Sequence, residues 1–364
     1  MMLDFYKGKR VLITGHTGFK GSWLSKIMIM AGADVYGYSL APSEGKENLY
    51  EISGIANEMD SHIGDIRNFE ELKEYFDKAK PEIVFHLAAQ PIVRDSYKDP
   101  RYTYETNVMG TVNVCECVRN CPSVKSFLNV TTDKVYENNE WVWGYREDEK
   151  LDGFDPYSNS KSCSELVTHS YINSFFNELG IAVSTARAGN VIGGGDFAND
   201  RLIPDCVRAA EKGDDIVLRN PDSTRPFQHV LEALSAYILL AQKQYEDKSY
   251  AGYYNVGPND DDAVTAGRLA GAFVDSWNKL VSENAGNKAF KGHGIKIVIR
   301  PDGGPHEASF LKLDCSKIKS RLKWSPKWNI DDAVAKTAEW TCAYFKGEAV
   351  ECMTDQIKEY YKQV

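Results

Sequence analysis

The chain has 364 residues and a formal net charge of -9, and 43% of its residues are hydrophobic and 26% charged. This composition is typical of a soluble globular protein, and the length predicts two domains or one large α/β domain with a smaller lobe. No apolar run approaches a membrane span, and residues 1–7 lack the apolar core of a secretion signal, so we expect a cytoplasmic protein without membrane contact. The acidic balance without a basic tract argues against nucleic acid as the main partner.

The cysteines give no sign of a metal centre. Cys115, Cys117 and Cys121 lie in a helical pattern, and no matching second ligand pair follows them in the sequence. A structural metal site needs such a set of ligands, so no metal is predicted.

A short strand and a glycine-rich turn open the fold. Residues 10–14 form a β-branched run, and Gly15-His16-Thr17-Gly18-Phe19-Lys20-Gly21 follows at once. A G-x-x-G-x-x-G turn between a strand and a helix lets the backbone approach a pyrophosphate at the helix N-terminus. A second strand at 34–40 follows after a helix of suitable length. The chain is therefore predicted to bind a dinucleotide through Gly15, His16, Thr17, Gly18, Phe19 and Gly21.

The end of the second strand bears on the identity of the cofactor. Many NAD-binding chains have an acidic residue there to hold the ribose hydroxyls, but this chain has Ser39-Leu40-Ala41-Pro42. No arginine follows directly to bind a 2′-phosphate. NAD is therefore predicted rather than NADP. Ser39 would lie beside the ribose and bind it weakly.

Two further strand ends supply cofactor contacts at the same edge of the sheet. Asp65, with Ile66 beside it, closes the third strand and could accept a hydrogen bond from the adenine amino group. Leu87, Ala88 and Ala89 follow the fourth strand, where small side chains let the backbone approach the cofactor.

Three polar residues near the fourth strand have different predicted roles. His86, within the strand, is interpreted as a core histidine rather than a catalyst. Gln90 lies where a substrate could meet the cofactor. Asn107, at the start of the next helix, is predicted to bind backbone near the active site.

The catalytic residues are predicted at the end of a fifth strand, at 127–130, and on the helix that follows. That strand delivers Thr132, Asp133 and Lys134 to the carboxyl edge of the sheet, where ligands bind in open α/β folds. Tyr157 and Lys161 are spaced by about one helical turn, so the lysine could stabilise a tyrosine phenolate, with Thr132 sharing the proton. Alone, Tyr-x-x-x-Lys is far more often part of a solvated helix face than a catalytic pair, and it is the dinucleotide fold at the start of the chain that favours a catalytic role.

Residues beyond about 185 supply several arginines in loops. Asn190 lies in a glycine-rich strand exit, Arg201 and Leu202 follow it, and Arg219 and Arg225 come later. Guanidinium groups grip a diphosphate bidentately, so Arg201 and Arg225 are predicted to bind substrate, whereas Arg219 is as well explained as a surface charge. Further strands are expected near 253–258 and 295–299, and helices near 263–280 and 331–361.

Five segments together resemble the extended short-chain dehydrogenase/reductase superfamily and, within it, the nucleotide-sugar 4,6-dehydratases. They are residues 15–23, 132–134, 141–146, 225–230 and 305–308, and the similarity covers nearly the whole chain. Lys134 favours the members that act on CDP-glucose, because the relatives for dTDP-glucose and GDP-mannose carry glutamate at this position. Phe227, where the family has tryptophan, is a mild departure.

The resemblance implies a doubly wound, parallel Rossmann sheet with a smaller α/β C-terminal substrate lobe. Residues 1–186 would form the NAD-binding domain, with returning segments near 226–258, and residues 187–364 would form mainly the nucleotide-sugar-binding lobe. Helices around 103–118 and 158–176 look like the pair that relatives use in a four-helix interface, so a homodimer or higher homo-oligomer is expected.

The resemblance also implies the reaction, a dehydration of CDP-glucose by internal hydride transfer through NAD, for deoxysugar and polysaccharide synthesis. Tyr157 would take the proton of the sugar 4-hydroxyl as C4 gives hydride to NAD, and Asp133 would protonate the departing 6-hydroxyl. Lys134 would either remove the C5 proton as a neutral amine or only position charge while another group acts as base. The substrate would contact Gln90, Asn190, Arg201, Leu202, Arg225 and His306, and the cofactor would also contact Asn107, Tyr157 and Lys161.

Two other functions stay open on the residues alone. A nucleotide-sugar 4-epimerase shares the tyrosine, the lysine and the cofactor, but it needs no acid and base at C6 and C5, so the adjacent Asp133 and Lys134 favour the dehydratase. A non-catalytic NAD-binding regulator would be expected to lack Tyr157 or Lys161, and both are present.

Overall fold

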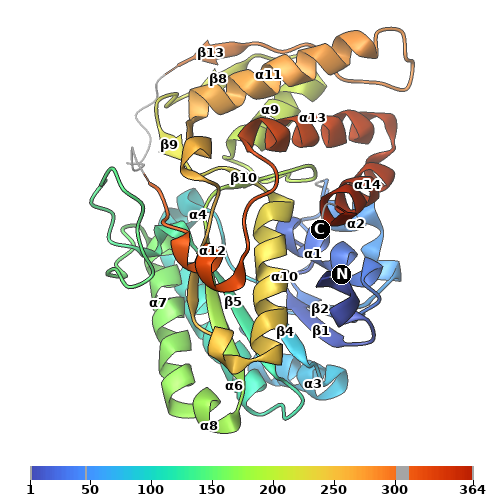
Figure 1. Cartoon of the computed structure of the whole chain (residues 1–364). Coiled ribbons are helices and arrows are strands. Elements are labelled where there is room, and N and C mark those ends of the chain that lie inside the picture. Colours follow the sequence, from blue (N-terminus) through green and yellow to red (C-terminus); the bar gives the residue numbers. More distant parts are fainter. Residues whose placement is uncertain (1, 46, 301–310, 363–364) are drawn as a thin grey trace.

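The centre of the molecule is a seven-stranded sheet in which every strand pair is parallel (Figure 1). The computed structural model describes residues 2–45, 47–300 and 311–362. From one edge to the other the strands are β3 (Asp60–Ile63), β2 (Asp34–Ser39), β1 (Arg10–Thr14), β4 (Ile83–His86), β5 (Ser126–Thr132), β6 (Ala182–Ala188) and β11 (Tyr253–Val256). The chain reverses direction across the sheet between β1 and β4, which is where an open α/β sheet binds its ligand.

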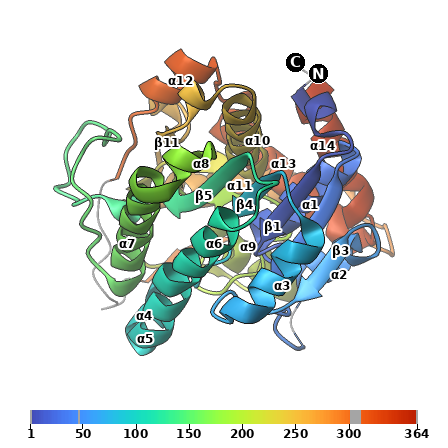
Figure 2. The same cartoon turned by 90° about the horizontal axis from the view of Figure 1, so that it is seen from below.

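Helices cover both faces of this sheet, so the predicted doubly wound fold is confirmed (Figure 2). One face is covered by α3 (Phe69–Ala79), α6 (Gly110–Arg119) and α7 (Pro156–Tyr171), and the other by α1 (Phe19–Met30) and α10 (Val230–Glu246). The central strands β4, β5 and β6 are buried along their whole length, as expected for a parallel sheet covered on both sides.

A smaller α/β lobe lies beyond the carboxyl edge of the sheet, at the top of Figure 1. Its helices are α9 (Leu202–Lys212), α11 (Ala266–Glu283) and α13 (Ile330–Lys346), and they enclose a separate apolar core that includes Phe273 and Trp277. Three two-stranded pairs complete it: β8 (Ile216–Leu218) with β13 (Ile297–Ile299), β9 (Thr224–Arg225) with β12 (Val264–Thr265), and β7 (Val191–Ile192) with β10 (Gln228–His229).

The chain crosses between the two parts more than once. It leaves the sheet after β6, returns with α10 and β11, and ends in α13 and α14 (Ala349–Lys362), which places α14 beside α2 (Leu49–Ser53). The predicted domain boundaries at 186 and 226–258 stay a prediction, but β11 and α10 do belong to the central sheet layers.

Short elements complete the described chain. They are α4 (Val93–Lys98), α5 (Pro100–Tyr104), α8 (Asn177–Leu179), α12 (Ser316–Leu322), π-helical turns at Glu105–Met109 and Ile172–Phe176, and 3-10 turns at Met2–Tyr6, Ile55–Asn57, Asp133–Val135, Lys248–Tyr250 and Asp260–Asp262.

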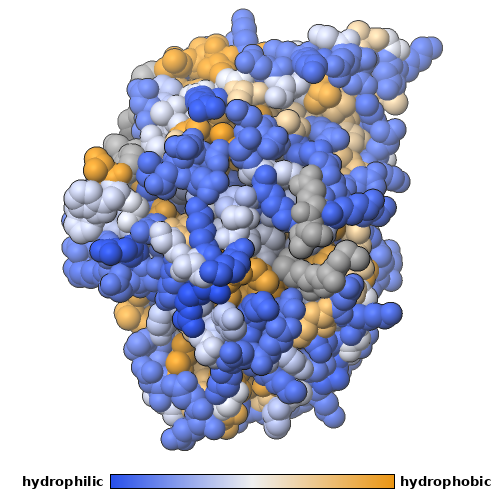
Figure 3. All heavy atoms as spheres, in the orientation of Figure 1, coloured by the Kyte–Doolittle hydropathy of each residue, from blue (hydrophilic) through white to orange (hydrophobic). Residues whose placement is uncertain are grey.

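The surface is mostly hydrophilic on the face drawn in Figure 3, with small apolar areas between the charged side chains. The loop between Tyr136 and Leu151, held at its base by a bridge between these two residues, exposes Val142 and Trp143. Among the described residues, no helix combines the length and the apolar character that crossing a bilayer would require.

Candidate active site

A cleft of about 1510 Å³ lies between the carboxyl edge of the sheet and the lobe. Its lining comes from the glycine-rich turn after β1, from the ends of β2, β4, β5 and β6, from the start of α7, and from the loop that leads into α9. The predicted catalytic and cofactor segments therefore meet in one place, although they are far apart in the sequence.

The glycine-rich turn has the shape that a phosphate group needs. Gly15 has φ +79°, and a Cβ there would lie 2.7 Å from the backbone nitrogen of Ala88, while a Cβ at Gly21 would lie 2.0 Å from the carbonyl oxygen of Gly15. Only glycine fits either position. Gly18 is the N-cap of α1 and makes no side-chain cap, so no side chain of the cap competes for the first N–H groups of the helix.

The residues around the adenosine end lie partly as expected. Thr17, Ser39, Asp65 and Ile66 line the cleft. Thr17 Oγ1 and Ser39 Oγ lie 2.8 Å apart. The Asp65 carboxylate accepts hydrogen bonds of 2.9 and 2.6 Å from the Arg67 guanidinium, so an adenine amino group would share an acceptor that is already paired.

Three predicted site residues do not line the cleft. The His16 side chain is buried against Gly37 and pairs with Ser61 at 2.7 Å. Gln90 is also turned inward, where its amide donates to Thr103 Oγ1 at 2.9 Å. Asn107 binds backbone, as predicted: its side chain accepts from the Gln90 N–H at 2.8 Å and donates to the Gln90 carbonyl at 3.0 Å.

His86 is a satisfied core histidine. Its ring nitrogens lie 2.7 Å from Thr14 Oγ1 and 3.2 Å from Thr111 Oγ1, and its pKa falls to about 3 because it is fully buried. The interpretation of His86 as part of the core is confirmed.

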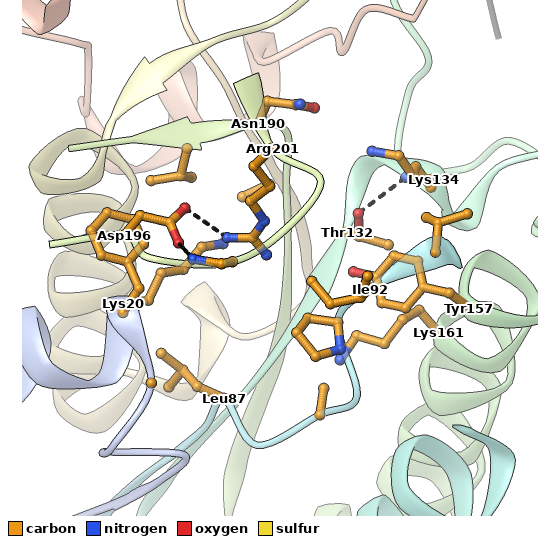
Figure 4. A pocket seen from close by; sticks show the side chains of 18 of the residues that line it. Lys20, Leu87, Ile92, Thr132, Lys134, Tyr157, Lys161, Asn190, Asp196 and Arg201 are labelled. Atoms are coloured by element: carbon orange, nitrogen blue, oxygen red, sulfur yellow. Dashed lines mark hydrogen bonds and ion pairs between the residues drawn. The ribbon is translucent and has the colours of Figure 1, made fainter. Parts of the chain in front are cut away.

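One wall of the cleft carries the predicted catalytic set (Figure 4). Thr132 ends β5, Asp133 and Lys134 form the 3-10 turn that follows, and Tyr157 and Lys161 project from the first two turns of α7. Asp155 caps this helix and Pro156 occupies its first position, which fixes the helix start just before Tyr157.

Burial dominates the acid–base properties of the Tyr157 and Lys161 pair. The pKa of Tyr157 rises to about 12 because the phenol is buried, and this rise is opposed by a hydrogen bond with Thr132 and by the positive charge of Arg201. The pKa of Lys161 falls to about 8 because the ammonium is buried, and Glu165 opposes that fall. Lys161 donates to the Val130 carbonyl at 2.9 Å, and Arg201 on the opposite wall supplies a positive charge that favours the phenolate of Tyr157.

Asp133 and Lys134 are close but differently exposed. Thr132 donates to Asp133 Oδ1 at 2.9 Å, and Lys134 Nζ lies 3.4 Å from the same oxygen. The second carboxylate oxygen of Asp133 is buried and has no hydrogen-bond partner within the described structure. The Lys134 side chain is 31% exposed and faces the cleft, as Figure 4 shows.

The opposite wall belongs to the lobe. Asn190, Arg201, Leu202 and Arg225 all line the cleft. Arg201 donates to the buried Asp196 carboxylate at 2.8 Å, and Figure 4 shows this pair across the pocket from Thr132 and Tyr157. The remaining predicted substrate residue, His306, lies outside the described residues.

Among the charged residues of the cleft that sequence reasoning missed, Lys20 and Asp196 interact with the predicted site residues. Lys20 lies within the glycine-rich turn, and its pKa falls to about 8, first because of burial and then because Arg201 and Lys161 add positive charge nearby. Asp196 is the partner of Arg201. Lys20 could have been noticed as a lysine within the glycine-rich turn itself, whereas no pattern marks Asp196.

The fold and this site define an extended short-chain dehydrogenase/reductase. The model of the GDP-mannose 4,6-dehydratase family matches residues 12–337. A CDP-glucose 4,6-dehydratase of Salmonella typhimurium is 47% identical over 365 residues, which cover 98% of this chain and 97% of that protein. The chain therefore belongs to the nucleotide-sugar 4,6-dehydratase family.

Solved structures agree on the fold. A dTDP-glucose 4,6-dehydratase of Bacillus anthracis in complex with NAD has a TM-score of 0.73 and 22% identity, over 94% of this chain and 99% of that one. A UDP-glucose 4-epimerase of Thermotoga maritima with UDP-glucose has a TM-score of 0.73 and 24% identity, over 90% of this chain and 97% of that one. Because dehydratases and epimerases share this fold, the fold alone does not distinguish the two reactions.

Proposed function

We propose that this chain is a CDP-glucose 4,6-dehydratase, which converts CDP-D-glucose to CDP-4-keto-6-deoxy-D-glucose and water. The observation that carries the proposal is the identity of 47% to the Salmonella enzyme across nearly the whole chain, together with Thr132, Asp133, Lys134, Tyr157 and Lys161 on one wall of the cleft. An epimerase needs no acid and base at C6 and C5, so it has no need of the adjacent Asp133 and Lys134.

The residues of the cleft fit NAD as the cofactor. The backbone of Gly15 to Gly21 would hold its pyrophosphate, Ser39 and Asp65 would lie at the adenosine end, and Leu87, Ala88 and Ala89 would lie beneath it. NAD bound there would supply a hydride acceptor at C4 of the sugar and return the hydride at C6.

Tyr157 performs the first proton transfer in this proposal. Its phenolate takes the proton of the sugar 4-hydroxyl, while the Thr132 hydroxyl shares that proton. Burial raises the pKa of Tyr157, so the charged form must be stabilised by the Thr132 hydrogen bond, by Arg201 and by the Lys161 ammonium in the same part of the cleft.

Asp133 and Lys134 act on the other side of the new ketone. The ketone acidifies the C5 hydrogen, a base removes it, and the Asp133 carboxyl gives its proton to the departing 6-hydroxyl so that water leaves. The base returns a proton to C5 when the hydride reaches C6. The unpartnered Asp133 oxygen is a buried position from which such a proton could be delivered. Lys134 either removes the C5 proton itself or supplies a positive charge that positions the substrate while another group is the base.

The lobe wall would hold the nucleotide diphosphate. Arg201 and Arg225 supply guanidinium groups, and Asn190 and Leu202 line the same part of the cleft. The base preference for cytidine rests on the similarity to the Salmonella enzyme.

The test is to incubate the protein with NAD and, separately, CDP-glucose, dTDP-glucose, UDP-glucose and GDP-mannose, and to follow the sugar nucleotides by mass spectrometry. Loss of one water from CDP-glucose alone is the expected result. Loss of water from another sugar nucleotide instead would overturn the substrate assignment, and inversion at C4 without loss of mass would replace the dehydratase by an epimerase.

We further propose that the protein works in the cytoplasm as a homodimer or higher homo-oligomer. All eight cysteines are unpaired, which suits a reducing compartment. Met109, in the π-helical turn just before α6, and Leu166 on α7 are exposed, which suits an interface between copies of the chain.

A further inference from the structure

A buried ion pair lies directly behind the catalytic wall. Glu165 on α7 and Arg187 on β6 are 2.9 Å apart, and their side chains are 1% and 3% exposed. A buried pair of charges costs desolvation energy, so it contributes little net stability compared with apolar residues. The pair is therefore a candidate for a role other than stability.

The Glu165 carboxylate contacts the strand that delivers the catalytic residues. It accepts hydrogen bonds from Thr131 Oγ1 at 2.5 Å and from Thr185 Oγ1 at 2.8 Å, in addition to the Arg187 bond. Thr131 is the residue immediately before Thr132. Glu165 itself lies one helical turn after Lys161 and two turns after Tyr157. One carboxylate thus joins the helix of Tyr157 to the strand of Thr132.

The Arg187 guanidinium contacts the segment that leaves the catalytic turn. It donates to Tyr136 Oη at 2.9 Å and to the Glu147 carbonyl at 3.0 Å. Tyr136 is the C-cap of the turn that contains Asp133 and Lys134, and its hydroxyl donates onward to Asn255 Oδ1 at 2.6 Å. One guanidinium thus holds the chain on the far side of the catalytic turn.

We propose that Glu165 and Arg187 are positioning residues, which hold the Thr132–Asp133–Lys134 turn in register with Tyr157 and Lys161. Glu165 holds one end of the turn, at Thr131, from the helix that carries the other two catalytic groups, and Arg187 holds the other end, at Tyr136, from β6. The inference rests on the proposed dehydratase reaction and deepens it.

The charge of Glu165 has a second effect, which gives the proposal an independent readout. Lys161 is buried and its pKa is lowered to about 8, and the negative charge of Glu165 keeps it from falling further. The other titratable groups near Lys161 are His86 on β4, which is neutral above about pH 3, Lys20 on α1 and Tyr157 on its own helix. Removal of the Glu165 charge should therefore lower the pKa of Lys161.

The chain offers a matched control for general damage to the fold. Glu232 on α10 is also fully buried and fully satisfied: it accepts from Tyr360 Oη at 2.6 Å and from the Trp328 N–H at 2.8 Å. It does not line the cleft. Glu232→Gln should cost stability as Glu165→Gln does, without any change at the catalytic wall.

The first experiment measures the pKa of Lys161 by NMR of protein labelled with 13C at the lysine ε-carbon, with the Lys161 signal assigned by its loss in Lys161→Arg. The expected result is a lower pKa in Glu165→Gln and an unchanged pKa in Glu232→Gln. An unchanged Lys161 pKa in a folded Glu165→Gln protein would overturn the electrostatic part of the proposal. This readout needs no enzyme activity.

The second experiment separates register from charge with Arg187→Lys, which keeps the positive charge but cannot reach Glu165, Tyr136 and Glu147 together. The expected result is a fall in kcat with little change in KM, and a primary isotope effect from deuterium at C4 that moves toward one, because loss of water at C5 and C6 becomes the slow step. If hydride transfer from C4 and loss of water slow by the same factor, the isotope effect stays as in the wild-type protein. That result would overturn the positioning role.

If single substitutions prevent folding, the double variant Glu165→Gln with Arg187→Gln leaves no buried charge unpaired and is measured in the same way. A wild-type protein without activity on any nucleotide sugar would defeat the proposed function, and the NMR experiment would still decide the electrostatic part. Full activity in a folded double variant would defeat the positioning role while leaving the proposed function intact.

Discussion

Lys161 shows at the scale of one residue how a site can work against the stability of its own fold. Its pKa falls from 10.5 to about 8 because the ammonium is buried, and its one hydrogen bond within the described structure is to the Val130 carbonyl. Between these two pH values the unfolded chain binds more protons than the folded chain, so this group makes the free energy of unfolding rise with pH. The penalty is fully present below about pH 8.

Lys161→Met should therefore stabilise the protein at pH 7 while removing activity. We expect the free energy of unfolding to rise by roughly 1–3 kcal/mol, which is below the full value of the pKa shift because the bond to Val130 is lost. The gain should shrink between pH 8 and pH 10. Urea unfolding at both ends of this range measures it. Lys279→Met, at a side chain that is 77% exposed, is the control, and lower stability of Lys161→Met at pH 7 would contradict the prediction.

Lys134 is the second residue whose role a substitution can decide. Lys134→Ala should reduce deuterium exchange at C5 of the 4-keto intermediate by about 10²–10⁴-fold if the amine is the base. NMR of the sugar nucleotide in deuterated water measures this exchange, and undiminished exchange would exclude Lys134 as the base.

Asp133→Asn completes that comparison, because the amide keeps the shape of Asp133 and cannot give up a proton. We expect this variant to bind NAD as the wild-type protein does. We expect it to lose most of its dehydratase activity. Full activity of Asp133→Asn would defeat its assignment as the acid.

At the scale of elements, α7 serves two surfaces at once. Its inner side carries Tyr157, which is half-buried at the cleft, and Lys161 and Glu165, which are buried, whereas Leu166 on its outer side is 56% exposed. Met109, at the start of α6, is 52% exposed, and α6 and α7 lie side by side on the outside of the sheet (Figure 2). Large apolar side chains exposed together on neighbouring helices are typical of an interface.

Leu166→Glu should therefore shift the protein toward monomers, because a carboxylate would be buried without a partner at the proposed interface. Sedimentation velocity over a range of protein concentrations measures the change. Val142→Glu, at a residue that is 76% exposed on the loop after Tyr136, serves as the control and should leave the assembly unchanged. A wild-type protein that sediments as a monomer would contradict the proposed interface.

At the scale of the whole molecule, Gly194 is a point where the two parts of the chain touch. Trp23 of α1 donates its indole N–H to the Gly194 carbonyl at 3.0 Å, and a Cβ at Gly194 would lie 2.0 Å from the ring of Trp340 on α13. Both tryptophans are buried. A methyl group cannot be inserted there without moving α13 or the loop that leads to Asp196 and Arg201.

Gly194→Ala should cost about 1–3 kcal/mol of stability and should lower activity as well, because the loop it displaces carries part of the cleft wall. Thermal unfolding and a kcat measurement check both effects. Gly271→Ala is the matched control: it lies within α11 with no atom within 4 Å of a Cβ, and alanine is the better helix former, so it should be neutral or slightly stabilising. An unchanged melting temperature for Gly194→Ala would contradict the prediction.

Local patterns predicted most of the sheet and the catalytic wall. The five strand ends of the first 132 residues, the glycine-rich turn and the Tyr157–Lys161 helix follow from short apolar and β-branched runs, glycine geometry and helical spacing, and the structure brings them to one edge. The inward turn of Gln90 and of His16 could not be predicted, because each depends on a partner, Thr103 or Ser61, that is distant in the sequence. The same holds for Glu165, whose partners Thr131, Thr185 and Arg187 lie on two strands, β5 and β6.

The order of strands has a consequence for synthesis on the ribosome. The edge strand β11 and the covering helix α10 are made only after the chain has passed through β7, α9 and β8 of the lobe. Until residue 256 has emerged, β6 presents an unpaired edge and one face of the sheet lacks α10, whose buried residues include Leu231, Leu234 and Tyr237. Nascent chains that end between about residues 190 and 250 should therefore be the ones that chaperones need to protect from aggregation, because open sheet edges and uncovered apolar faces promote it.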